Sequence, residues 1–189
     1  MSRISSTSKW SKSERSVIQL IKDSGNRTEF ASGAVRDIQE GKGRCDLLPL
    51  GIIGELYDRK FGADGTGRIF SMIELFQTHG DFNCLYAAIE QFHALSDFTA
   101  WSDMWLEVAV HFEEGAKKYQ ANNWKKGIPV SRYIDSGTRH LLKWLREDTD
   151  ERHDRAFCWN MLCAIWTCIN CPELNEYAQG GADDECGQG

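Results

Sequence analysis

Helical spacing of apolar residues is the feature that most constrains the fold of this chain. From about residue 47 to residue 171, most segments place apolar side chains three or four positions apart, and the whole sequence contains only three prolines. This spacing predicts amphipathic helices. Convincing strand alternation is absent, and so is the strand–helix rhythm of a Rossmann or P-loop architecture. We therefore predict an all-α bundle of five or six helices.

Turn and capping residues divide the bundle into segments. The run LLPLGIIGELYDRKFG has Pro near its start and Gly at its end, which suits the two ends of a helix, and Asp81 is a candidate N-cap. We expect helices in the segments 47–62, 66–78, 81–96, 101–119, 131–146 and 150–171. The domain is expected to span 28–171, between a flexible N-terminal segment (1–27) and a flexible acidic, Gly-rich tail (172–189).

Composition excludes several classes of protein. The formal net charge of −6 argues against binding to DNA or RNA backbone, which depends on a basic surface. There is no apolar run of the roughly 20 residues that a membrane helix needs, and no secretory signal, so we expect a cytoplasmic protein. The seven cysteines are an odd number and lie mostly among helical apolar residues, as reduced core thiols do. Cys168 and Cys171 form a CxxC without the second pair of a structural zinc site.

Four carboxylates in two helical segments are the strongest functional signal. Glu113 and Glu114 lie in WLEVAVHFEEGAKKY, and Glu151 and Asp154 lie in TDERHDRAF. Carboxylates that converge from two helices repel one another unless a divalent cation lies among them. Such a cation is the usual tool for chemistry on phosphate esters. Solvated i,i+4 ion pairs and helix N-capping are the competing explanations.

The segment 101–119 has two faces. An apolar stripe, predicted to face the core, comprises Trp101, Trp105, Val108, Phe112, Ala116 and Tyr119. The polar face beside it comprises Glu107, His111, Glu114 and Lys118. Periodicity does not decide whether Glu113 or Glu114 points into the bundle.

Basic and aromatic residues near these acids could hold a phosphorylated ligand. Candidates for substrate contacts are Lys42, Arg44, Lys118, Asn123 and Trp124. Lysine, arginine and amide donors bind phosphate oxygens, and an indole ring can stack on a base. The loop EGKGR lacks the frame of a Walker motif. His140 and His153 are more often structural residues than ligands in such positions.

A family resemblance rests on long runs of this sequence. The run HFEEGAKKYQANNWKKGIPVSRYIDSGTRHLLKW, continued by DERHDRAFCWNMLC, resembles the phage and bacterial dATP/dGTP diphosphohydrolase family. The upstream run GAVRDIQEGKGRCDLLP fits the family's N-terminal block, so the resemblance covers roughly residues 28–171. These proteins are related to the MazG-type, all-α nucleoside triphosphate pyrophosphohydrolases. The MazZ-like branch comes from phages that replace adenine with 2-aminoadenine.

The resemblance implies hydrolysis of dGTP or dATP to the monophosphate and pyrophosphate, with two or three Mg²⁺ or Mn²⁺ ions. In MazG-type enzymes an ExxE-like helix and an ExxD helix hold the ions. The positions that fit are Glu113 or Glu114 on the first helix, and Glu151 with Asp154 on the second. The third glutamate of the first motif is replaced by Lys117, so Asp135 is a candidate to complete the shell, with Asn160 as an alternative.

Two other functions stay open. The departure at Lys117 allows a non-catalytic nucleotide-binding or interaction protein on the same bundle. A helical phosphohydrolase of another type is a further possibility, although the His153-Asp154 dipeptide lacks the second histidine cluster of an HD-type enzyme. Many aromatic residues on short helices would suit a homodimer or homotetramer.

Overall fold

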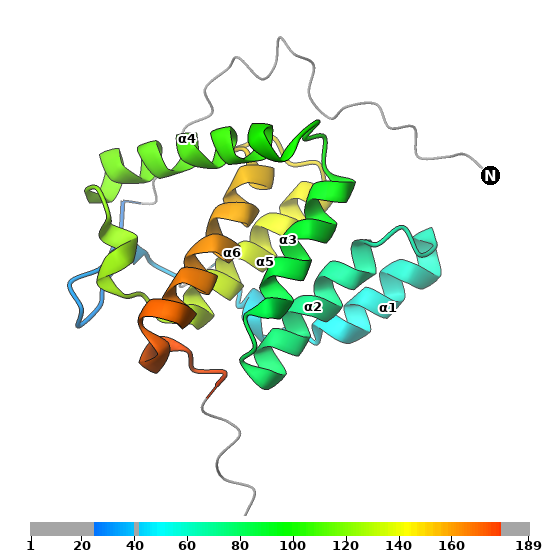
Figure 1. Ribbon diagram of the computed structural model, residues 1–189, viewed down its shortest axis with the longest axis horizontal. Coiled ribbons are helices and arrows are strands. Elements are labelled where there is room, and N and C mark those ends of the chain that lie inside the picture. The colour runs from blue at the N-terminus through cyan, green and yellow to red at the C-terminus, as the bar shows by residue number, and fades with distance from the viewer. Residues whose placement is uncertain (1–24, 40–41, 179–189) are drawn as a thin grey trace, which may run out of the picture.

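The computed structural model describes residues 25–39 and 42–178, and within them six α-helices follow a short β-hairpin (Figure 1). The hairpin pairs β1 (Arg27–Glu29) antiparallel with β2 (Val35–Asp37). The helices are α1 (Leu50–Phe61), α2 (Thr66–His79), α3 (Asn83–Leu95), α4 (Trp101–Tyr119), α5 (Val130–Leu145) and α6 (His153–Asn170). Three short 3-10 helices are η2 (Cys45–Leu47), η3 (Asn123–Lys126) and η4 (Pro172–Leu174).

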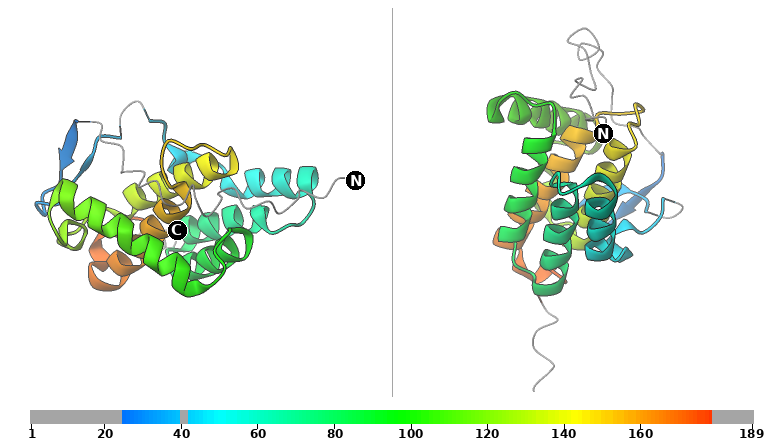
Figure 2. Two further views of the ribbon diagram at one scale, coloured as in Figure 1. Left: turned by 90° about the horizontal axis from the view of Figure 1, so that it is seen from above. Right: turned by 90° about the vertical axis from the view of Figure 1, so that its right-hand side faces the viewer.

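Helices α5 and α6 form the centre of the bundle. They pack along each other, while α1, α2 and α3 pack in chain order beside them. Helix α4 crosses the end of this group, over α6 (Figure 1). The β-hairpin lies near the C-terminal end of α4, at the far side of the molecule from α1 (Figure 2). This arrangement leaves the hairpin, α4, α5 and α6 around one common space.

Helix α6 is buried on almost every side because other helices surround it. Its fully buried residues include Phe157, Cys158 and Met161, and Phe157 packs against Phe92 of α3 with ring centroids 4.6 Å apart. A helix in this position needs no polar face over its middle turns. Beyond it, the segment 172–178 returns to the core, where the ring of Tyr177 packs edge-on to Phe76 at 5.3 Å.

Glycines permit the close contact of α1 with α2. A Cβ atom at Gly54 would lie 2.6 Å from the carbonyl oxygen of Gly67, and one at Gly67 would lie 2.5 Å from the carbonyl oxygen of Gly54. Backbone atoms cannot yield as the end of a side chain can. The two helices therefore meet at a point that only glycine fits.

Replacing Gly54 by Ala should lower the free energy of unfolding by about 1–3 kcal/mol, because the added methyl group forces the two helices apart. Urea unfolding followed by circular dichroism measures the change. Gly115→Ala is the matched control, since a Cβ there meets no atom within 4 Å. That variant should gain about 0.5–1 kcal/mol from higher helix propensity. Equal stability of the Gly54 variant and the parent protein would show that the helices do not meet in this way.

The predicted all-α bundle is confirmed, and so is the helix that begins after Pro49 and ends before Gly62. Two details differ. The β-hairpin was not predicted, because strands of three residues are too short to show alternation. Helix α6 begins at His153 instead of residue 150, after a loop in which Glu147 has a positive φ of 65°.

The predicted core stripe of α4 is wrong at its N-terminal end. Trp101 and Trp105 are 42% and 36% exposed, whereas Met104, His111 and Glu114 are buried. The buried face therefore includes His111 and Glu114, which belong to the polar face of the predicted helix. None of the helices among residues 25–39 and 42–178 is both long and apolar enough to cross a membrane.

Candidate active site

A cavity of about 770 Å³ lies between the β-hairpin, α4, α5, α6 and η3. Helix α5 supplies one complete face of it, formed by Arg132, Asp135, Ser136, Arg139, His140 and Lys143. Steps of three and four keep these side chains on one side of the helix. From Arg132 to Lys143 the helix rises about 16 Å, which is long enough to accommodate an extended nucleoside triphosphate.

One end of the cavity is aromatic. Phe112, Trp124 and Trp159 line it, with ring centroids 5.3 Å apart for Phe112 and Trp124 and 5.8 Å apart for Phe112 and Trp159. The guanidinium of Arg36 lies over the Trp159 ring at 5.7 Å, and its Nη2 donates to Asn160 Oδ1 at 2.5 Å. Rings of this kind bind a flat, apolar group such as a nucleobase.

Cationic side chains line the cavity along its length, namely Arg36, Lys42, Arg132, Arg139 and Lys143. Burial lowers the pKa of the Lys42 ammonium, and so does nearby Arg139, although Asp37 at 3.8 Å acts in the opposite direction. Burial also lowers the pKa of Arg132. Burial makes the charged forms of these side chains less stable, and a nearby anion would stabilise them. A polyphosphate ligand would supply such an anion.

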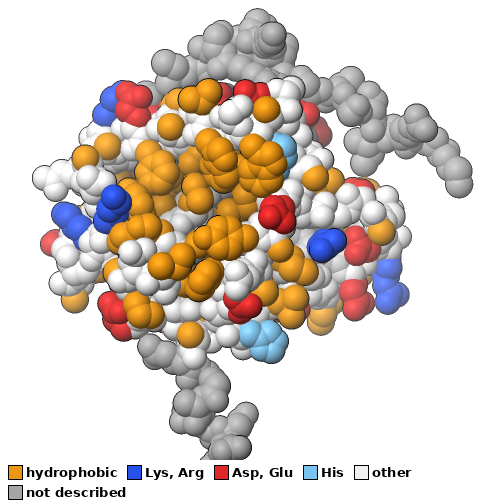
Figure 3. Space-filling model, viewed as in Figure 1, with side chains coloured by type: hydrophobic (Ala, Val, Ile, Leu, Met, Phe, Trp, Pro, Cys, Tyr) orange, Lys and Arg blue, Asp and Glu red, His pale blue; other side chains and the backbone are white. Residues whose placement is uncertain are grey.

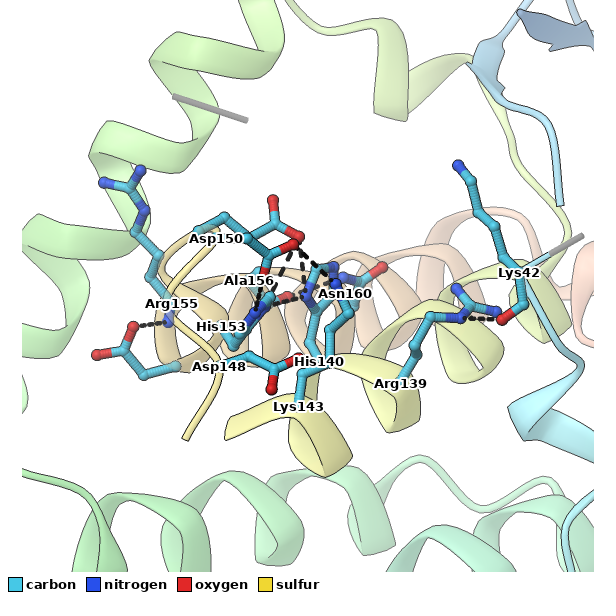
Figure 4. Close-up of polar contacts among 12 residues, drawn as sticks. Lys42, Arg139, His140, Lys143, Asp148, Asp150, His153, Arg155, Ala156 and Asn160 are labelled. Carbon is cyan, nitrogen blue, oxygen red and sulfur yellow. Dashed lines mark hydrogen bonds and ion pairs between the residues drawn. The ribbon is translucent and has the colours of Figure 1, made fainter. Parts of the chain in front are cut away.

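Another part of the cavity wall contains two histidines and a glutamate. Figure 4 shows the two histidines, His140 and His153, side by side. His140 Nδ1 and His153 Nδ1 lie 3.0 Å apart, and Glu151 Oε1 lies 3.5 Å from the first and 3.6 Å from the second. His140 and Glu151 line the cavity, and His153 is only 2% exposed beside them. Burial, reinforced by His153, holds the pKa of His140 well below its usual value. The imidazole of His140 is therefore neutral at pH 7, as a metal ligand must be.

Asp150 and Lys143 orient this cluster from behind. His153 Nε2 lies 2.8 Å from Asp150 Oδ1, and Lys143 Nζ donates to Asp150 Oδ2 at 3.0 Å. Burial would raise the pKa of Asp150, but these two hydrogen bonds outweigh it and lower the pKa to about 2. The ionised carboxylate accepts the Nε2 proton of His153, so the lone pair of His153 lies on Nδ1, toward Glu151 and His140.

Of the four carboxylates expected to hold a cation, only Glu151 is in a group of possible metal ligands among the described residues. Glu114 is buried, and both of its oxygens accept hydrogen bonds of 2.8 Å from Arg155 Nη2. Asp154 is buried as well, and Arg152 donates to its two oxygens at 3.0 and 2.6 Å. Neither of these two acids is among the described residues that line the cavity.

Glu113 and Asp135 do line the cavity, but each is paired with the charged side chain of a lysine or an arginine. Glu113 lies on the exposed side of α4, where Lys117 Nζ donates to it at 2.5 Å. Asp135 is buried and accepts from Arg139 Nη2 at 2.6 Å, from Gln39 Nε2 at 2.6 Å and from the Cys45 amide at 2.7 Å. Asp135 thus fixes the segments on both sides of residues 40–41 to α5.

The expected substrate contacts divide in the same way. Lys42, Asn123 and Trp124 line the cavity, although the Asn123 side chain also bonds both backbone groups of Val35, at 2.9 and 2.7 Å. Two others lie outside the lining. Arg44 pairs with Asp46 at 2.5 Å, and Lys118 pairs with Asp37 at 2.9 Å.

His111 makes the protein sensitive to acid. Burial lowers its pKa from 6.5 to about 3, assisted by Arg155 and Arg36. Because the unfolded chain takes up this proton first, the free energy of unfolding falls as the pH drops below about 6.5. Between pH 7.5 and pH 5 the parent protein should lose about 2 kcal/mol more than His111→Gln, measured by urea unfolding at both pH values. His79→Gln, at an exposed position, should behave as the parent does. An equal loss in the His111 variant would contradict this assignment.

The part of the chain that forms most of this site resembles a known family. Residues 91–177 match the family model described as dATP/dGTP diphosphohydrolase, N-terminal. This part of the chain is therefore similar to the dATP/dGTP diphosphohydrolase family. The match runs from the end of α3 through η4 and contains the whole His–Glu cluster, with the α4, α5 and α6 walls of the cavity. No curated protein and no solved structure matches the chain.

The sequence did not predict the pairing of His140 with His153. Each histidine alone resembled a structural residue. The signal was their position on either side of the short loop that joins two adjacent helices, where a tight connection brings the last turn of one beside the first turn of the next. Carboxylate and imidazole donors gathered in this way could bind a metal ion.

Proposed function

We propose that this protein hydrolyses dGTP and dATP to the nucleoside monophosphate and pyrophosphate within the cavity. The observation that carries the proposal is the lining of the cavity, which brings together aromatic rings from α4, η3 and α6, a row of cations that lies mostly on α5, and the His–Glu cluster. The family that residues 91–177 resemble carries the name of the same chemistry. The reaction would take place in the cytoplasm, where deoxynucleotides are made.

The aromatic end suits the base, and the cationic row suits the phosphates. Trp159 and Phe112 offer ring faces on which a purine can stack. Lys42 and Arg139, which lie next to each other in Figure 4 and both line the cavity, would neutralise the phosphate oxygens. Asp135 ties the segments on either side of residues 40–41 to α5, and Asn123 ties the β-hairpin to η3. Walls fixed in this way would keep a bound substrate in one orientation for attack at the α-phosphorus.

A divalent cation, Mg²⁺ or Mn²⁺, would supply charge for the phosphate oxygens and lower the pKa of the attacking water. Glu151 fits the role of ligand, because it lies in the cavity beside two imidazoles. Glu114 and Asp154 fit better as partners of Arg155 and Arg152 that hold α4 and α6 in place. Further ions would bind mainly through the triphosphate itself.

Hydrolysis in H₂¹⁸O tests the reaction. With dGTP and Mn²⁺ the label should enter dGMP, and pyrophosphate should be unlabelled, when the products are separated by chromatography and weighed by mass spectrometry. Labelled pyrophosphate would place the attack on the β-phosphorus, and release of orthophosphate or triphosphate would mean a different reaction. Either result would contradict the proposal.

A non-catalytic nucleotide-binding protein is the second candidate, since arginines bind both Glu114 and Asp154. Calorimetry separates the two functions. Binding of dGTP without turnover under any divalent ion would favour the second candidate, whereas turnover excludes it.

The biological setting is part of the proposal. In a phage that replaces adenine with 2-aminoadenine, dGMP from dGTP would feed synthesis of the modified nucleotide.

We also propose a homo-oligomer, because apolar side chains gather over α3, α4 and α6 on the face shown in Figure 3, and Trp101, Trp105 and Ile169 are among the exposed apolar residues of these helices. Sedimentation would measure its size. We propose no DNA, RNA or membrane partner, in keeping with the net charge of −6.

A further inference from the structure

The His–Glu cluster has the dimensions of a metal centre. The three distances between His140 Nδ1, His153 Nδ1 and Glu151 Oε1 are 3.0, 3.5 and 3.6 Å. A point equidistant from the three atoms lies about 2.0 Å from each, which is the usual length of a bond from nitrogen or oxygen to a first-row metal ion. The donors are therefore already spaced to share one ion without movement of the backbone.

The neighbouring residues prepare these donors. Asp150 accepts from His153 Nε2 at 2.8 Å, and Lys143 holds Asp150 at 3.0 Å. A carboxylate behind a ligating imidazole fixes the tautomer and raises the basicity of the ligand. His140 Nδ1 and His153 Nδ1 lie 3.0 Å apart, and with the Nε2 proton of His153 directed at Asp150, His140 Nδ1 would be the donor between them. Moving the Nδ1 proton of His140 to Nε2 of the same ring frees both lone pairs with no net loss of charge.

The other group of donors in this region is a poorer site. Asp148, Asp150 and His153 also lie near one another, but Arg146 Nη2 is 2.5 Å from Asp148 and Lys143 Nζ is 3.0 Å from Asp150. This group uses the opposite nitrogen of His153 and does not line the cavity among the described residues. Only the first group faces the place where phosphates would lie.

We infer that His140, Glu151 and His153 form a two-histidine, one-carboxylate centre that binds a transition-metal ion such as Mn²⁺ or Co²⁺ in preference to Mg²⁺. Imidazole nitrogen is a better ligand for these ions than for Mg²⁺, which favours oxygen donors and keeps its water. Three protein ligands leave the remaining coordination positions of the ion open for water and phosphate oxygens. Asp150 is a positioning residue, because it acts through His153. The inference deepens the proposed function, and the site it names differs from a shell made of carboxylates alone.

Metal titration without nucleotide tests the inference on the full chain. After treatment with a chelator, the protein should bind one Co²⁺, seen by its visible absorption, and one Mn²⁺, seen by loss of the free-ion signal in electron paramagnetic resonance. Mg²⁺, measured by competition, should bind at least about a hundredfold more weakly. Equal affinity for Mg²⁺ and Mn²⁺ would overturn the inference.

Variants locate the ion. Glu151→Gln and His140→Gln should each weaken Co²⁺ binding by about a hundredfold or more, and Asp150→Asn by about ten- to a hundredfold with a shifted absorption spectrum. Glu113→Gln, at the exposed rim of the same cavity, should bind as the parent does. Unchanged affinity in both the Glu151 and His140 variants would overturn the inference, even if other residues bind the ion.

The inference about the metal centre and the proposed function can be contradicted independently of each other. An ion bound at this centre without hydrolysis of any deoxynucleotide would leave the inference intact and remove the proposed function. Hydrolysis in the parent protein, with metal affinity unchanged in the Glu151 and His140 variants, would support the proposed function and remove the inference about the metal centre.

Discussion

Replacing Glu151 by Gln is expected to lower the rate of dGTP hydrolysis by about a hundredfold or more. The amide is nearly the same size as the carboxylate, but it has no charge with which to hold a divalent ion beside His140 and His153. The fold should remain, because Glu151 lies in the loop before α6 and not in the core. Single-turnover hydrolysis measures the effect, and urea unfolding should show a loss below about 1 kcal/mol.

Glu90→Gln is the matched control for this experiment. It makes the same chemical change at an exposed position on α3, a helix that does not line the cavity among the described residues. It should hydrolyse dGTP at the parent rate. If the Glu151 variant also kept the full rate, Glu151 would have no part in the reaction.

Replacing Glu114 by Ala is expected to destabilise the protein by about 3–5 kcal/mol. The substitution removes the carboxylate that accepts two hydrogen bonds from Arg155 and leaves that buried guanidinium poorly compensated. Thermal and urea unfolding measure the loss. A loss of stability of this size would identify the Glu114–Arg155 ion pair as a contact that holds α4 against α6.

Glu113→Ala supplies the comparison one position along the same helix. Glu113 is exposed and pairs with Lys117, whose side chain is also exposed. Its denaturation midpoint should match that of the parent. If Glu114→Ala were as stable as the parent but inactive, Glu114 would be a residue of the site and not of the contact between α4 and α6.

The helices of this fold could be predicted because local signals agree with their positions. Pro49 and Gly62 flank α1, and the apolar spacing of α4 gives its span of Trp101–Tyr119. The inward face of α4 could not be predicted in the same way. Glu114 and Lys118 belong to the polar face, and periodicity does not decide whether such residues point inward. Each is paired with a charge from a distant segment, Arg155 or Asp37.

The site shows the same division. Sequence motifs drew attention to Glu151 and to the cationic loop at Lys42, both of which line the cavity. They did not predict that an arginine binds Asp154, since Arg152 is a sequence neighbour whose side chain could have pointed elsewhere. Nor did they predict that His140 and His153 meet, because this contact depends on the loop between α5 and α6. Pairings across a fold are decided by packing, which short-range patterns do not record.

A crystal structure with Mn²⁺ and the α,β-imido analogue of dGTP would test the central claim most directly. The anomalous signal of manganese should lie within bonding distance of Glu151, His140 and His153, with the triphosphate beside Lys42 and Arg139 and the base against Trp159. Manganese found between Glu114 and Asp154, or a nucleotide bound outside this cavity, would contradict the account.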